Sequence, residues 1–73
     1  MPAGYAPCYD PGDIIRFNKQ ISDTEEVVHL LIEAVSIDLM GQSWYYVTEL
    51  EGDRAYALEC WTVDNCSMFK KVA

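Results

Sequence analysis

The chain has 73 residues, enough for one domain with one hydrophobic core and too few for a second. Hydrophobic residues make up 51% and charged residues 23% of it, a composition that excludes a disordered tail and a membrane span of about 20 apolar residues. The formal net charge of -7 disfavours direct binding to nucleic acid or to anionic membranes.

The N-terminal residues predict an arm and a compartment. Residues 1–10 show no hydrophobic periodicity and contain proline and glycine, so we expect an arm, or a strap over the domain, that Tyr5 and Tyr9 hold in place. The first residues lack the basic and apolar stretches of a secretory signal, which favours the cytoplasm. Residues 11–73 should then form the single domain.

A turn and a short strand are predicted next. Asp10-Pro11-Gly12-Asp13 matches a type II turn, with glycine where φ must be positive. The first strand should cover Asp13 to Phe17, with Ile15 and Phe17 on the inner face. The polar stretch from Asn18 to Thr24 predicts a loop.

The segment from Ser22 to Leu39 fits two structures. Apolar residues at helical spacing, after a capping-box pattern of Ser22 and Glu25, suit a helix at about 23–35 and an α+β fold. The many β-branched residues favour instead a long bent strand with one apolar face. That face would hold Val28, Leu30, Ile32 and Ala34. We expect the strand, followed by a turn at Asp38 to Gln42.

The C-terminal half predicts a hairpin and a closing strand. Apolar runs from Trp44 to Leu50 and from Ala55 to Val63 flank the turn Glu51-Gly52-Asp53-Arg54. Alternation within the second run places Tyr56, Leu58 and Cys60 on the inner face. A single 3₁₀ turn should follow over Val63 to Ser67, and Met68 to Val72 should pair with the first strand.

This layout resembles the SH3-like barrels, specifically the small bacteriophage-encoded and bacterial proteins of that type. The similarity covers about Pro11 to Val72 and is carried by Gly12-Asp13-Ile14-Ile15, Tyr45-Tyr46-Val47, Trp61, Asp64 and Phe69-Lys70-Lys71-Val72. It implies an all-β fold, a small barrel of about five antiparallel strands with a 3₁₀ turn before the last. It implies no catalytic residues, because a fold does not fix a function.

The sequence predicts no enzyme, cofactor or metal site. It contains no phosphate-binding loop and no recognisable nucleophile motif. The three cysteines form no C-x-x-C pair, and together with His29 they are too scattered for a typical zinc site. Cys60 should be a small buried hydrophobic residue, and His29 a half-exposed strand residue.

The predicted function is binding to another protein through the outer face of the hairpin. Aromatic side chains there suit an interface, and the carboxylates at the hairpin turn suit a basic partner. The predicted binding residues are Trp44, Tyr46, Trp61, His29, Leu31, Glu49, Glu51 and Asp53. The resemblance suggests a phage-encoded accessory or inhibitor protein that binds a host protein in the host cytoplasm. Two alternatives are an acidic nucleic-acid mimic that blocks a DNA- or RNA-binding enzyme, and a structural subunit of a homo-oligomer.

Overall fold

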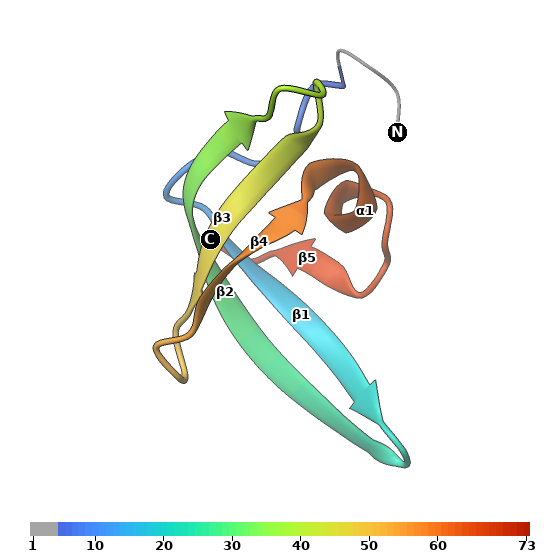
Figure 1. Ribbon diagram of the computed structural model, residues 1–73. Helices are drawn as coiled ribbons and strands as arrows, with labels where there is room; N and C mark the ends of the chain where they lie inside the picture. The colour runs from blue at the N-terminus through green and yellow to red at the C-terminus, as the bar shows by residue number, and fades with distance from the viewer. Residues whose placement is uncertain (1–4) are drawn as a thin grey trace.

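The computed structural model describes residues 5–73, which form one open antiparallel sheet and one short helix (Figure 1). The elements are β1 (Ile14–Ile21), β2 (Thr24–Ile37), β3 (Ser43–Glu49), β4 (Ala55–Glu59), α1 (Cys60–Asp64) and β5 (Phe69–Lys71). The strand order is β4-β3-β2-β1-β5. The predicted all-β class with five antiparallel strands is therefore confirmed, and the alternative helix at about 23–35 is wrong because β2 covers that segment.

The hairpin of β1 and β2 is longer than predicted and extends beyond the rest of the sheet (Figure 1). The predicted loop from Asn18 to Thr24 is wrong, since Lys19 pairs with Glu26 in the β1–β2 ladder. Polar residues can form such a ribbon because both of its faces meet solvent. The turn is confined to two residues, and Ser22 has a φ of 54° there.

Two predicted turns are confirmed. At the first, the Asp13 N–H donates to the Asp10 carbonyl at 3.0 Å, and Gly12 has the φ of 95° that a type II turn requires. At the second, between β2 and β3, both oxygens of Asp38 accept hydrogen bonds, and Gly41 has a φ of 81°. The Asp38 side chain thus holds this turn closed.

A β-bulge in β2 changes which residues face the core. Val28, Leu30 and Ile32 are buried as predicted. The pairing with β3 shifts between Ile32 and Ala34, so the residue between them is left out of the ladder. As a result Ala34 is exposed, contrary to the prediction, and Val35 packs against the core instead.

The hairpin of β3 and β4 has the predicted inner face, but β4 ends earlier than predicted, at Glu59. Tyr56, Leu58 and Cys60 all pack in or against the core. The predicted 3₁₀ turn over Val63 to Ser67 is wrong, because the chain leaves the sheet earlier, in the one-turn α-helix α1. A spacing of three residues places Cys60 and Val63 on one side of that helix, and both are buried.

One hydrophobic core lies between the inner faces of the strands and α1. Its fully or nearly buried apolar members are Ile15, Val28, Leu30, Ile32, Tyr45, Val47, Cys60 and Val63. Phe17, which was predicted to face inward, packs against this core. Its ring stacks on Phe69 with centroids 4.5 Å apart, which ties β1 to β5. The predicted pairing of the last strand with the first is confirmed.

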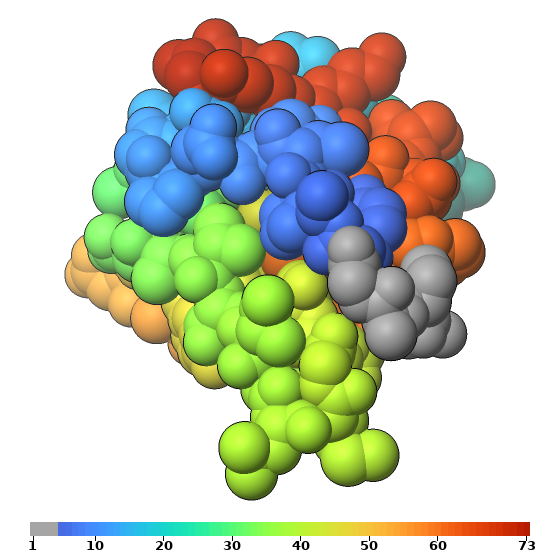
Figure 2. Space-filling view, turned by 90° about the horizontal axis from the view of Figure 1, so that it is seen from above, coloured from blue at the N-terminus to red at the C-terminus, as the bar shows by residue number. Residues whose placement is uncertain are grey.

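The N-terminal segment lies across one end of the sheet, between the C-terminal residues and the β2–β3 turn (Figure 2). Its anchor is the carboxylate of Asp64, which accepts hydrogen bonds from the Tyr5 hydroxyl at 2.6 Å and the Cys8 N–H at 3.0 Å. The Tyr9 N–H donates to the Tyr45 hydroxyl at 3.1 Å. Tyr5 and Tyr9 thus hold this segment, as predicted. The part of the predicted arm at residues 1–4 lies outside the described residues, and the division into arm and domain stays a prediction.

Candidate functional site

An open apolar groove of about 490 Å³ lies on the outer face of β3 and β4. It is lined by Glu33, Tyr46, Val47, Thr48, Ala55, Tyr56 and Ala57, and we call it the Tyr46 groove. Tyr46 lies opposite Ala34 on β2 and Ala57 on β4. Methyl groups on both sides leave the tyrosine ring uncovered, so 46% of the residue is exposed. The predicted outward position of Tyr46 is confirmed.

One border of the Tyr46 groove is anionic. The residue that the β2 bulge leaves out of the ladder is Glu33, and this exposed residue lines the groove. The Thr48 hydroxyl donates to Glu33 Oε2 at 3.0 Å, which directs the carboxylate toward β3. A hydrogen-bonded carboxylate beside apolar surface is suited to a ligand that combines an apolar group with a cation.

Trp44 lies on the outer face as predicted, but its indole is engaged within the chain. The Nε1–H donates to Asp38 Oδ2 at 2.9 Å, and the residue is half-buried. This bond, together with the N–H of Gln42, holds the pKa of the Asp38 carboxyl below its ordinary value. Trp44 therefore fixes the β2–β3 turn and presents less free surface than Tyr46.

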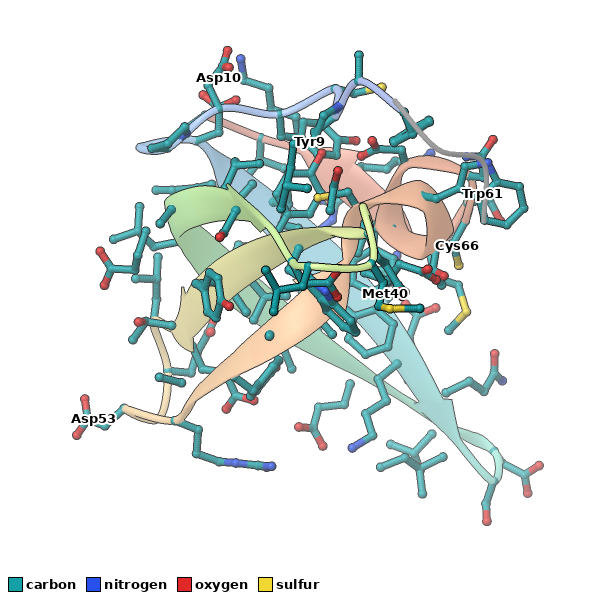
Figure 3. All side chains as sticks on the ribbon, turned by 45° about the horizontal axis from the view of Figure 1, so that its top comes forward. Tyr9, Asp10, Met40, Asp53, Trp61 and Cys66 are labelled. Carbon is teal, nitrogen blue, oxygen red and sulfur yellow. The ribbon has the colours of Figure 1, made fainter. Side chains whose placement is uncertain are left out.

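Trp61 does not lie on the outer face of β4, contrary to the prediction. It belongs to α1, because the chain leaves the sheet after Glu59, and Figure 3 shows its side chain at the helix, away from the β3–β4 turn. Trp61 is 43% exposed. The three predicted aromatic anchors thus belong to two surfaces, with Trp44 and Tyr46 on the sheet and Trp61 on the helix.

The predicted carboxylate cluster does not form one surface. Glu49 faces inward, where it accepts the Tyr56 hydroxyl at 2.8 Å. Burial, followed by this bond to Glu49, raises the pKa of Tyr56 to about 12. Asp53 is exposed at the tip of the β3–β4 turn and points away from the sheet (Figure 3). Alternation along β3 and the length of the turn separate the two groups.

The third carboxylate, Glu51, caps the neighbouring strand. Glu51 Oε1 accepts the backbone N–H of His29 at 2.8 Å, and Oε2 lies against the His29 imidazole. These bonds hold the pKa of the Glu51 carboxyl below its ordinary value. His29 is a half-exposed strand residue, as predicted, and Leu31 is half-buried on the same face. Neither lines the Tyr46 groove.

Two features went unnoticed in the sequence. Leu39 and Met40 are almost fully exposed in the β2–β3 turn. Their position inside the predicted turn at Asp38 to Gln42 could have indicated this exposure, because turns lie at the surface. The hydrogen-bond cluster at Asp64 had no such signal, because Tyr5 is 59 positions away in the chain.

The thiol of Cys60 is buried in the hydrophobic core. Burial raises the pKa of the Cys60 thiol to about 11, so this group stays protonated and weakly nucleophilic at neutral pH. Within residues 5–73, no three side chains of His, Cys, Asp or Glu lie close enough together to hold a metal ion. In the same part of the chain, no helix has the length and hydrophobicity needed to cross a membrane.

Comparison of the chain with protein-family models, with curated proteins and with solved structures gave no match.

Proposed function

We propose that this chain is a non-enzymatic protein-binding module whose docking site is the Tyr46 groove. The observation that carries the proposal is a tyrosine that is 46% exposed beside a groove of about 490 Å³ with mainly apolar lining residues. Tyrosine is enriched at the energetic centre of protein interfaces, where one partner inserts a side chain into a pocket of the other. The partner should therefore supply an apolar side chain that fills the groove.

The charge of the chain supports a basic partner. The formal net charge is -7, and Glu33 contributes a carboxylate at the border of the groove. Complementary charge raises the rate of association and selects the orientation in which two proteins meet. A partner with lysine or arginine beside its apolar residue fits this surface best.

The finer fold that we propose is an SH3-like barrel. The strand order β4-β3-β2-β1-β5, a single helical turn between the last two strands and the bulge in β2 support it, because a bulge bends a long strand from one half of such a barrel into the other. The resemblance of the sequence to small phage-encoded proteins supports a partner in the cytoplasm of a bacterial host.

Two matched variants test the docking site. Tyr46 and Trp61 are similarly exposed, at 46% and 43%, yet only Tyr46 lines the groove. Immobilised Tyr46→Ala should capture about tenfold less of the partner from a bacterial host lysate than the unaltered chain, as expected for a central interface residue. Trp61→Ala should capture the same amount. Thermal unfolding by circular dichroism checks that both variants are folded. Full capture by Tyr46→Ala would contradict the proposal.

A further inference from the structure

The two edges of the sheet differ in how well they are protected against pairing with another strand. β5 has three residues, two of which are Lys70 and Lys71. Short length and lysine are common protections of an edge strand. β4 has five residues, Ala-Tyr-Ala-Leu-Glu, and pairs with β3 in unbroken register without proline, lysine or a bulge. β4 is therefore the edge that is open to an added strand.

The register of β4 shows which of its backbone groups face outward. The Glu49 N–H donates to the Arg54 carbonyl at 2.8 Å, which continues the β3–β4 ladder into the turn. Hydrogen-bonded and non-bonded pairs alternate along an antiparallel ladder. Tyr56 therefore directs its backbone groups toward β3, as Arg54 does. Ala55 and Ala57 direct theirs to the other side, where the described part of the chain places no strand.

The same two alanines line the Tyr46 groove, so the open edge and the groove are continuous. On an added strand, a residue opposite Ala57 would have its side chain on the outer face. Ala57 contributes only a methyl group between that side chain and Tyr46, its neighbour on β3. A large apolar residue at this position could therefore lie over the methyl group and contact the tyrosine ring.

On the outer face, a carboxylate lies near each end of the stretch of β4 that holds Ala55 and Ala57. Glu59 is two positions beyond Ala57 on β4. Its carboxylate accepts hydrogen bonds from the Gln42 side-chain amide and from the Thr62 hydroxyl. At the other end, Glu33 is bonded to Thr48, which pairs with Ala55. Side chains at alternate positions of a strand share a face. A segment with a large apolar residue between two basic residues, each two positions away, matches this arrangement of charge.

We propose that the partner binds as a sixth strand along β4, through an extended segment of the pattern basic, any, large apolar, any, basic. This inference rests on the proposed function, because it specifies how the Tyr46 groove is occupied. The outward backbone groups of Ala55 and Ala57 supply hydrogen bonds, and the groove selects the central side chain.

A synthetic peptide tests strand addition directly. The probe is the peptide Thr-Lys-Thr-Phe-Thr-Lys-Thr, which is added to the isotope-labelled chain up to about 1 mM. With a Kd of about 1 mM, half of the chain is then bound, and amide exchange at the bound groups is about twofold slower. We expect the largest NMR shifts and the slowed exchange at Ala55 and Ala57, with further shifts at Tyr46. Replacing both lysines of the peptide by glutamate should weaken binding about fivefold or more. Replacing its phenylalanine by serine should abolish binding. Absence of shifts at Ala55 and Ala57 would overturn the inference.

A pair of proline variants separates this inference from the proposed function. Ala57→Pro removes an outward N–H of β4, a change that an edge strand can accept. Lys71→Pro is the matched change on β5. We expect Ala57→Pro to lose capture of the partner by about tenfold and Lys71→Pro to retain it. If Tyr46→Ala loses capture and Ala57→Pro does not, the docking site stands and strand addition is wrong. If Tyr46→Ala has no effect, the proposed function itself fails.

A second copy of this chain could occupy the same edge. Light scattering of the free protein would then show a dimer, and the Ala55 and Ala57 amides would exchange slowly before any peptide is added. We expect a monomer with fast exchange at both amides, and a dimer that Ala57→Pro dissociates would overturn the inference.

Discussion

Tyr45 and Tyr46 are adjacent residues of the same type with opposite surroundings. Tyr45 is completely buried between Val35 and Leu58, and Tyr46 is 46% exposed between Ala34 and Ala57. Strand alternation sends the two rings to opposite faces of the sheet, and their cross-strand neighbours decide what each face can do. Large neighbours make the inner tyrosine part of the core, and alanines leave the outer one available to a partner.

The two faces should differ most in how much stability is lost when a leucine is replaced by alanine. Leu30 is completely buried and Leu31 is its half-buried neighbour on the outer face. Leu30→Ala should lower the free energy of unfolding by about 3 kcal/mol, because it leaves a cavity in the core. Leu31→Ala should cost less than about 1 kcal/mol. Urea unfolding, monitored by tryptophan fluorescence, measures the free energy of unfolding of both variants. Equal decreases would show that the two faces contribute equally to stability, contrary to this prediction.

Removal of one hydroxyl from each tyrosine gives a smaller effect. The Tyr45 hydroxyl donates to Asp64 Oδ1 at 2.8 Å and accepts the N–H of Tyr9. Tyr45→Phe leaves both partners without this bond and should cost about 1–3 kcal/mol. Tyr46→Phe should change stability by less than about 0.5 kcal/mol, since its hydroxyl is on the solvated face. Urea unfolding measures the cost, and amide exchange at Tyr9 should become faster in Tyr45→Phe alone. Unchanged exchange there would contradict the anchoring role of Tyr45.

The smallest expected effect depends on pH and concerns Trp44, the other aromatic residue on the outer face of β3. The hydrogen bond from Trp44 lowers the pKa of the Asp38 carboxyl in the folded chain, so the unfolded chain binds more protons in acid. This contribution is present above the ordinary pKa of aspartate and is lost as the pH falls through the lowered value. Asp38→Asn should therefore be less stable than the unaltered chain at neutral pH, and this difference in stability should narrow as the pH falls below the ordinary pKa of aspartate, about 4.

Thermal unfolding of Asp38→Asn and of the unaltered chain, from neutral pH down into acid, measures how the difference in their stability changes. Asp53→Asn is the control, because Asp53 lies exposed at the tip of the β3–β4 turn. A difference that stays constant with pH would show that the Trp44 bond to Asp38 does not depend on the charge of the carboxylate.

Where one face of a strand is apolar, the sequence predicted the structure well. Val28, Leu30 and Ile32 were assigned to the inner face by alternation, and Tyr46 to the outer face. The prediction failed at Asn18 to Thr24, because a solvated two-stranded ribbon has no apolar face to reveal it. The site could be predicted only in part. Tyr46 was identified, but the alanines that form the groove around it carry no signal of their own.

The sequence by itself determined the all-β class, the main hairpin and the faces of its strands, because a period of two in hydrophobicity is a local property. Tertiary structure decided the rest. The bulge at Glu33 moves Ala34 outward, and the early helix removes Trp61 from the sheet. These outcomes depend on contacts between residues far apart in the chain, as do the burial of Tyr45 and the exposure of Tyr46. Such contacts decide which ring the core covers, and no window of neighbouring residues contains them.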